Sequence, residues 1–353
     1  MAKNTGIVKN AQYVRHGGVF SQPESPERLS AIYDMLENPD MSWKFNNIDA
    51  RYATRRELEM VHLPSYIDAI AATAGKNLTM LDPDTAATAD TFDAARLAAG
   101  GFIAAIDSVV SGETDNAFAM VRPPGHHAAA NAAAGFCIFN NIAIGARYAL
   151  DRLGMKRVLI VDWDLHHGNG TQQAFYEDDN VLYFSTHQSP AYPWTGRPEE
   201  TGKGEGAGYT INVPLRPGAG DAMYIRVFQD ILLPVAHKFR PEIILVSAGF
   251  DPYEGDPLGE MKVTPAGFAG LARILLDLAE EVCGGRVVAA LEGGYNVLGL
   301  VKCVRAVLLE FLGETRATQE AVARLAGKAD LDNEPAIENV RKLQAAYWPI
   351  LNG

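Results

Sequence analysis

The sequence predicts a single α/β domain built on a mostly parallel, multi-stranded sheet with helices on both faces. Apolar segments alternate with helical patterns along most of the chain, as expected for a parallel sheet and its crossover helices. The apolar segments are apolar almost throughout, which is typical of strands buried on both faces. With 353 residues, the chain is long enough for one large domain. No repeat or linker divides it, so we expect one domain over residues 1–353 with its core at about 20–314.

The expected elements follow one another in alternation after about residue 90. Strands are expected at 116–122, 157–164, 180–186, 242–248 and 286–292. Helices are expected at 91–111, 140–153, 221–238, 265–282 and 296–313. Residues 315–353 are predicted to form two further helices that pack on the outside.

Composition excludes several classes of protein. The net charge of −12 argues against a nucleic-acid binder, which would present a basic surface. No apolar run approaches the roughly 18 residues of a membrane span, and residues 1–12 lack the apolar core of a secretory signal. Three scattered cysteines form neither a disulfide frame nor a cysteine-based zinc site. We therefore expect a cytoplasmic protein without a membrane or nucleic-acid partner, and a homo-oligomer stays open.

Each expected strand ends in polar or glycine-rich residues. Ligands of parallel α/β sheets bind at the carboxyl ends of the strands, so these segments are expected to meet at one edge. They are RPPGHH (122–127), DWDLHHGNG (162–170), STHQ (185–188), SAGFD (247–251) and EGGYN (292–296).

The DWDLHH segment predicts a metal site. If the strand stays extended, Asp162, Asp164 and His166 point to the same face. A cation would offset the cost of burying two carboxylates, and a mixed oxygen and nitrogen set suits zinc. A third ligand should come from another strand end, and Asp251 is the best candidate. The alternative is that the carboxylates cap the helix that begins near Thr171.

Two further segments offer groups for proton transfer. His126 and His127 follow a stiff Pro-Pro turn, which suits a general base that must be held in place. Tyr295 follows two glycines and could donate to a developing oxyanion. From the motif alone, a turn tyrosine with its hydroxyl in water is favoured. Gly135 and Phe136 fit either a close approach beside an apolar wall or ordinary core packing.

Taken together, these motifs resemble the zinc-dependent histone deacetylase family, which includes bacterial amidohydrolases and acetylpolyamine amidohydrolases. The resemblance begins at Gln22-Pro23-Glu24, where family members often have His-Pro-Glu, and ends near Glu314. It rests on RPPGHHA, GFCIFNN, DWDLHHGNGTQ, AGFDPYEGDPLG and EGGYN, which occur in the family's order. Trp163, Asn169 and GDPLG resemble the class II branch rather than class I. The implied fold is the arginase/deacetylase-like α/β fold.

The resemblance implies a role for each candidate residue. Zinc, one ion per chain, would be bound by Asp164, His166 and Asp251. The catalytic residues would be His126, His127 and Tyr295. A structural potassium ion would be bound by Asp162, Asp164, His166, Ser185 and Thr186, some of them through backbone carbonyls. The acyl-lysine tunnel would be lined by Gly135, Phe136, Tyr192 and Leu258, with Tyr192 in place of the usual Phe.

The implied reaction is metal-assisted hydrolysis of an N-acyl-lysine amide in a peptide or protein. An N-acetylpolyamine or another small amide is the alternative substrate, although Leu258 is not acidic and the 76–90 loop is short. An arginase-like two-metal hydrolase and a non-enzymatic acyl-lysine binding module are further alternatives. A nucleotide-binding reading of GKGEGAG (202–208) is the weakest, because no strand precedes it.

Overall fold

The fold is known from a computed structural model, which describes residues 3–17, 22–314, 320–322 and 333–352. Its centre is an eight-stranded sheet in which every pairing is parallel, in the order β2-β1-β5-β10-β9-β6-β7-β8. The strands are β1 (Thr5–Val8), β2 (Asn46–Ile48), β5 (Asn116–Ala119), β6 (Val158–Asp162), β7 (Val181–Gln188), β8 (Thr210–Leu215), β9 (Ile243–Ala248) and β10 (Val287–Leu291). A separate hairpin pairs β3 (Thr79–Met80) with β4 (Ala86–Ala87).

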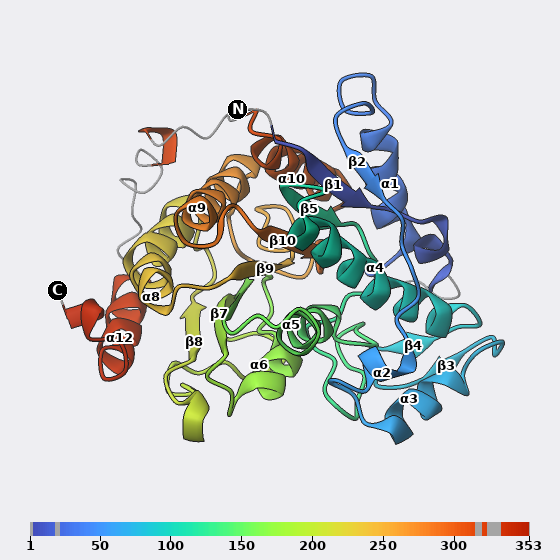
Figure 1. The fold of residues 1–353 in the computed structure, drawn as a ribbon, viewed down its shortest axis with the longest axis horizontal. Helices are drawn as coiled ribbons and strands as arrows, with labels where there is room; N and C mark the ends of the chain where they lie inside the picture. The colour runs from blue at the N-terminus through green and yellow to red at the C-terminus, as the bar shows by residue number, and fades with distance from the viewer. Residues whose placement is uncertain (1–2, 18–21, 315–319, 323–332, 353) are drawn as a thin grey trace.

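Helices lie on both sides of the sheet, as Figure 1 shows. One side carries α4 (Thr91–Ser111), α5 (Asn141–Asp151) and α6 (Asn169–Phe175), and the other carries α8 (Leu233–Phe239), α9 (Pro265–Cys283) and α10 (Val297–Phe311). The remaining helices are α1 (Pro26–Leu36), α2 (Arg55–Leu58), α3 (Pro64–Ala71), α7 (Asp221–Val227) and α12 (Glu334–Gln344). The predicted single α/β domain with a parallel sheet is confirmed.

All five predicted strands are present, and three strands of the central sheet and the β3–β4 hairpin were not predicted. The missed strands of this sheet are β1, β2 and β8. The strands β1 and β2 are short, and β2 and β8 are the two edge strands, each paired on one side only. The strand β8 contains Pro214, which cannot donate to a neighbour and is tolerated at an edge. Sequence patterning detects such elements poorly, because they lack the long apolar run of a central strand.

The predicted helices are present with one change. The helix expected at 221–238 is divided into α7, a π-helical turn at Phe228–Leu232, and α8. Pro234 lies in the first turn of α8 and has no N–H to bond back into the preceding turn, which accounts for the break. Of the two expected C-terminal helices, α12 is present, and the first falls largely on residues outside the described range.

The helix α4 is the one described helix that is long and apolar enough to cross a membrane. Of its most apolar 18-residue window, 72% is buried inside the protein. Glycines at 100 and 101 let the helix approach its neighbours closely, since a Cβ at Gly100 would lie 2.0 Å from the Arg51 carbonyl oxygen. We conclude that α4 is a central helix of the fold.

Candidate functional site

The carboxyl ends of β6 and β9 bring three candidate ligand side chains together. Among the described residues, Asp164, His166 and Asp251 form a group whose ligand atoms all lie within 4.8 Å of one another. The Nδ1 atom of His166 is 3.3 Å from Asp164 Oδ1 and 3.0 Å from Asp251 Oδ2. The predicted set of two carboxylates and one imidazole is therefore assembled as a candidate metal site.

The local backbone that builds this group differs from the one predicted. The strand β6 ends at Asp162, and the next residues turn instead of staying extended. The Asp164 N–H donates to Asp162 Oδ1 at 3.2 Å, and the His166 N–H donates to Asp164 Oδ1 at 2.8 Å. The predicted extended conformation is therefore wrong, and of the three residues that it placed on one face, Asp164 and His166 lie in the group with Asp251 while Asp162 does not. The turn is held by the Asp162 and Asp164 carboxylates, each of which accepts a hydrogen bond from the backbone N–H two residues later.

Glycines next to the site let the backbone reach the carboxylates. The Gly293 N–H donates to Asp164 Oδ2 at 2.8 Å. A Cβ at Gly293 would lie 2.4 Å from Asp251 Oδ2, and one at Gly249 would lie 2.0 Å from Asp164 Oδ2. Any larger side chain at either position would displace a candidate ligand, which explains the glycines in SAGFD and EGGYN.

The two carboxylates are buried together, and this has an electrostatic cost. Burial, with the Asp164 charge beside it, raises the pKa of Asp251 to about 7. Against the effect of burial, neighbouring histidines keep the pKa of Asp164 below its usual value. A divalent cation would remove this repulsion and hold both groups ionised, so the donor set fits a metal such as zinc.

The helix-capping alternative does not match the structure. The helix α6 begins at Asn169 and has Gly168 at its N-cap, and no side chain in the described part of the chain caps it. The carboxylate of Asp162 instead bonds the His126 ring and the Tyr183 hydroxyl, each at 3.1 Å.

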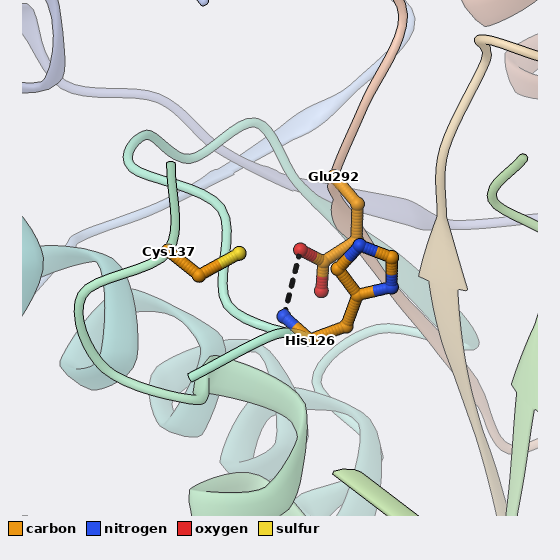
Figure 2. Close-up of side chains that lie close together, drawn as sticks. All are labelled: His126, Cys137 and Glu292. Atoms are coloured by element: carbon orange, nitrogen blue, oxygen red, sulfur yellow. Dashed lines mark hydrogen bonds between the residues drawn. The ribbon is translucent and has the colours of Figure 1, made fainter. Parts of the chain in front are cut away.

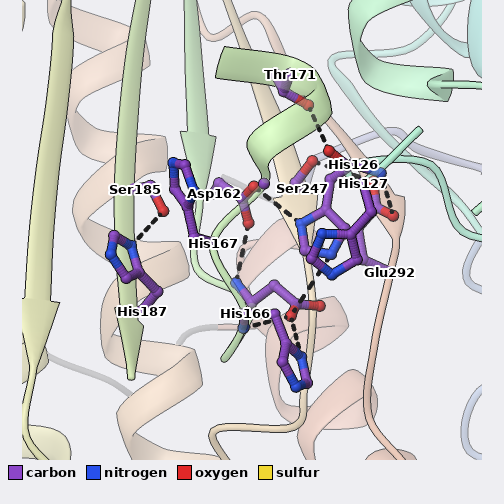
Figure 3. Close-up of polar contacts among 12 residues, drawn as sticks. His126, His127, Asp162, His166, His167, Thr171, Ser185, His187, Ser247 and Glu292 are labelled. Atoms are coloured by element: carbon purple, nitrogen blue, oxygen red, sulfur yellow. Dashed lines mark hydrogen bonds and ion pairs between the residues drawn. The ribbon is translucent and has the colours of Figure 1, made fainter. Parts of the chain in front are cut away.

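The tandem histidines lie against each other with different partners (Figure 3). Their ring centroids are 4.0 Å apart. His126 Nδ1 lies 3.1 Å from Asp162 Oδ2, and His127 Nδ1 lies 2.8 Å from Asn169 Oδ1. Although burial lowers it, the Asp164 and Asp162 charges raise the pKa of His126 to about 10. Burial and the charge on His126 lower the pKa of His127 well below its usual value. Of the two imidazoles, His126 therefore has the higher proton affinity.

A second group of possible metal ligands consists of His126, Cys137 and Glu292, all of them buried (Figure 2). Its polar atoms already have partners. Glu292 Oε2 accepts from the Gly125 N–H at 2.7 Å and the His126 N–H at 3.3 Å, and Oε1 accepts from the Ser247 hydroxyl at 3.1 Å. The Cys137 thiol donates to the Gly135 carbonyl. This group fixes the histidine turn and does not form a second metal site.

A cavity of about 370 Å³ opens above the candidate metal group. It is lined by the predicted tunnel residues together with three of the predicted chemical groups: Gly135, Phe136, Tyr192, Leu258, His127, His166 and Tyr295. A Cβ at Gly135 would lie 2.3 Å from the His127 ring, so this glycine is a close-approach point. His126 does not line the cavity, which places His127 alone of the pair at its surface.

Tyr295 lies in the cavity wall and not in open solvent. Its ring packs edge-on against Phe136, with centroids 5.9 Å apart, and the Arg28 guanidinium lies 5.0 Å from its centroid. Burial raises the pKa of the phenol well above its usual value, so the hydroxyl keeps its proton. The motif alone favoured a turn tyrosine with its hydroxyl in water, and the structure adds that the ring forms part of the cavity wall.

Sequence reasoning missed a buried ionic network beneath Tyr295. Arg122 and Arg28 both bond the Glu24 carboxylate, and all three side chains are fully buried. Arg28 also donates to the carbonyls of Glu292 and Gly294, on either side of the glycine that contacts Asp164. Charged residues inside an apolar domain are expensive unless paired, but nothing in a single sequence shows which partners meet.

Sequence reasoning also missed an acidic residue in the cavity wall. Asp84 belongs to the β3–β4 turn and lines the cavity. Its Oδ1 accepts from the Gly135 N–H at 3.1 Å and the Thr85 hydroxyl at 2.6 Å. The DPDT turn (82–85) was a weak signal for this residue, because such turns are common at protein surfaces.

The residues assigned to potassium lie side by side on neighbouring strands. Asp162 at the end of β6 pairs in register with Ser185 of β7, and both are fully buried. Among the described residues, the buried hydroxyl of Thr186 has no hydrogen-bond partner. The side-chain oxygens of Asp162 and Ser185 already have hydrogen-bond partners within the protein.

Comparisons with known proteins agree with this geometry. The model of the histone deacetylase domain matches residues 22–311. The chain belongs to the histone deacetylase family. A solved structure described as the HDA15 HD domain superposes with a TM-score of 0.92 at 38% identity, covering 99% of this chain and 96% of that one. The fold and the family are thereby established, and the chain is a deacetylase.

The relatives are named as deacetylases of different substrates. A probable deacetylase of Archaeoglobus fulgidus is 40% identical and matches over 98% of both chains. The polyamine deacetylase HDAC10 of Homo sapiens is 40% identical over 93% of this chain and 50% of its own length. Histone deacetylase 15 of Arabidopsis thaliana is 41% identical, and the chain spans 59% of its length. The reaction of this histone deacetylase family member is deacetylation, and its relatives include proteins named as histone deacetylases and as polyamine deacetylases.

Proposed function

We propose that this deacetylase hydrolyses N-acyl-lysine side chains of peptides or proteins, with one zinc ion held by Asp164, His166 and Asp251. The observation that carries the proposal is the cavity, since its half-buried aromatic walls lead to His127, His166 and Tyr295 at one end. A narrow apolar channel with reactive groups at its floor suits a long alkyl stem that ends in an amide.

Zinc held by these three residues would supply Lewis acidity, which would polarise an acyl carbonyl and lower the pKa of a water molecule bound to it. The Asn169 side-chain oxygen accepts from His127 Nδ1, which leaves Nε2 of the neutral ring free to take a proton from the attacking water. His126 stays protonated between Asp162 and Asp164 and acts electrostatically. The Tyr295 hydroxyl donates to the oxygen that becomes negative, and His127 returns its proton to the leaving amine.

A structural potassium ion completes the proposal. Its ligands would come from Asp162, Asp164, His166, Ser185 and Thr186. The support is that the ends of β6 and β7 are buried side by side, with Asp162 and Ser185 in register. A monovalent cation there would offset the charge of Asp162, which burial otherwise makes expensive.

The entrance supports a polypeptide substrate. Leu258 is 38% exposed and lines the cavity, so an apolar side chain stands at the mouth. The 76–90 segment forms only a short hairpin of two-residue strands and does not build a long wall. A bulky substrate could therefore bring its acylated side chain to the opening. We also propose a cytoplasmic location, in keeping with three buried free cysteines.

An N-acetylpolyamine is the second candidate substrate. The observation that favours it is Asp84, whose carboxylate in the cavity wall would attract a second ammonium group. Its Oδ1 is already bonded to Gly135 N–H and the Thr85 hydroxyl, which reduces its capacity for another donor. We therefore rank the polyamine below acyl-lysine.

The two remaining alternatives receive less support. A two-metal hydrolase requires a second ligand group, but the His126, Cys137 and Glu292 atoms are bonded within the protein. An inactive binding module is at odds with a cavity lined by His127, His166 and Tyr295, with the other two candidate ligands grouped around His166.

The test is hydrolysis of a matched panel by zinc-loaded protein: acetyl-lysine peptides, longer acyl-lysine peptides and N-acetylated polyamines. A hydroxamate, which chelates zinc, serves as the inhibitor control. We expect a higher kcat/KM for the peptides. A higher value for the polyamines would replace the proposed substrate, and turnover that the hydroxamate does not inhibit would contradict zinc chemistry.

A further inference from the structure

A second hollow lies beside the mouth of the catalytic cavity. It measures about 310 Å³ and shares Pro190 and Ala191 with the catalytic cavity, so the two are neighbours along one wall. Trp194 and Arg197 line its other side. The proposed chemistry uses neither residue, and both are exposed, Trp194 to 72%.

The loop that carries these residues is held firmly from beneath. His187 Nε2 donates to the Gly196 carbonyl at 2.9 Å, and His167 Nδ1 lies 2.7 Å from the Thr195 hydroxyl. A Cβ at Gly196 would lie 2.6 Å from both histidine rings. Two buried histidines without a part in the proposed reaction therefore fix the position of this loop.

Trp194 adopts a backbone conformation that is unfavourable for a tryptophan. Its φ is +65°, in the left-handed region that glycine occupies without penalty. Such conformations persist when surrounding contacts impose them, and they gather at ligand-binding sites. Because the indole is mostly exposed, it contributes little packing to offset the conformation. Its large flat surface is available for a ligand.

Arg197 places a positive charge in the wall of this second hollow. Its guanidinium has no ion-pair partner within the residues the structure describes, although the protein has a net charge of −12. Its backbone carbonyl, by contrast, is bonded to the Asn212 side chain and the Glu200 N–H. The backbone is thus anchored while the cationic group stays free.

We propose that Trp194 and Arg197 bind the polypeptide that flanks the acylated lysine, with Trp194 packing against its chain and Arg197 pairing with an acidic residue. This inference rests on the proposed function, since it requires a polypeptide at the cavity mouth. Charge complementarity decides the kind of partner, because an exposed arginine attracts a carboxylate and repels the additional ammonium groups of a polyamine.

The test uses acetyl-lysine peptides that differ at one residue. Aspartate or asparagine is placed in turn at each of the three positions on either side of the acetyl-lysine. For the wild-type protein we expect one position at which the Asp peptide has a kcat/KM about 2- to 5-fold higher than the Asn peptide, the range of an exposed ion pair. The ratio should fall toward 1 in 0.5 M NaCl.

Substitutions assign this preference to the surface. Arg197→Gln should bring the Asp-to-Asn ratio to about 1, and Arg197→Glu should invert it. Trp194→Ala should raise KM for all the peptides with little change in kcat. The matched control is Arg152→Gln, an exposed arginine between α5 and the amino-terminal end of β6, which should keep the wild-type ratio.

Acetyl-lysine with small blocking groups separates two kinds of failure. If the blocked amino acid is hydrolysed and the peptides show no Asp preference, or Arg197→Gln keeps it, the inference is wrong while the proposed function stands. If neither the blocked amino acid nor any peptide is hydrolysed, the proposed function itself has failed.

Discussion

The floor and the rim of the catalytic cavity are built in opposite ways. Directly beneath the floor, Asp162, Glu292 and His126 are buried, and each is fixed by two or more described contacts. On the rim, Leu258, Trp194 and Arg197 are exposed, and their side chains make few contacts. A floor held by many bonds tolerates little change, whereas a rim residue can be exchanged at small cost. We infer that the floor determines the reaction and the rim determines the substrate.

The largest effect is expected from removing one candidate ligand. Asp251→Asn keeps an oxygen for the Leu165 N–H, which Asp251 Oδ1 now accepts at 2.9 Å, so the fold should survive. Loss of the anionic ligand should reduce zinc content and lower kcat/KM by about 10³-fold, the equivalent of roughly 4 kcal/mol. Metal analysis and steady-state kinetics check this. Full zinc occupancy with normal turnover would exclude Asp251 as a ligand.

The next effect concerns the hydroxyl of Tyr295. Tyr295→Phe keeps the ring against Phe136 and Arg28, so the protein should fold normally and retain zinc. Because one oxyanion donor is lost, kcat should fall by about 10²–10³-fold with KM little changed. Circular dichroism and metal analysis serve as controls. Unchanged turnover would remove Tyr295 from the mechanism.

A smaller effect, on stability, is expected from the buried network beneath the floor. Although burial opposes it, the Arg122 and Arg28 charges lower the pKa of Glu24 from 4.5 to about 2. A lowered folded-state pKa stabilises the protein above pH 4.5, and this stabilisation, about 3 kcal/mol, is lost as the pH falls toward 2. Glu24→Gln should therefore be less stable at pH 7, with a difference from wild type that shrinks below pH 4.5.

Urea unfolding of both proteins at pH 7 and at pH 3.5 measures this difference. The comparison removes the contributions of other acidic groups, because these groups are shared by wild type and variant. An equal difference at both pH values would show that Glu24 acts through packing alone.

The smallest effect should come from the rim. Leu258→Glu adds a carboxylate at the mouth, beside the wall that contains Asp84. An exposed charge contributes up to about 1 kcal/mol, so kcat/KM for an N-acetylpolyamine should rise about 5-fold relative to a neutral acetyl-lysine peptide. Leu258→Gln is the matched neutral control. A shift of the same size in both variants would rule out an electrostatic origin.

Sequence reasoning recovered the floor better than its surroundings. Long apolar strands that end in DWDLHH, SAGFD and EGGYN predicted both the parallel sheet and the assembly of Asp164, His166 and Asp251. The reason is physical, since parallel strands bring their carboxyl ends to one edge whatever the details of the loops. The direction of each side chain was harder, because the turn after Asp162 is made by hydrogen bonds that a periodicity argument does not contain.

Contacts between distant segments could not be predicted. The pairing of Glu24 with Arg122 joins residues 98 positions apart, and Asp84 reaches the cavity only because its turn bonds to Gly135. The exposure of Trp194 depends on two histidines beneath its loop. Each of these features depends on tertiary packing, of which a single sequence gives no local signal.

The most direct test of the account is a zinc titration of the metal-free protein. Deacetylation of an acetyl-lysine peptide is measured as zinc is added, with Asp251→Asn as the parallel sample. We predict that activity rises from near zero and reaches its plateau at one zinc ion per chain, while the variant stays close to the baseline. A plateau only at two ions per chain, or full activity in the metal-free protein, would contradict the single-metal floor.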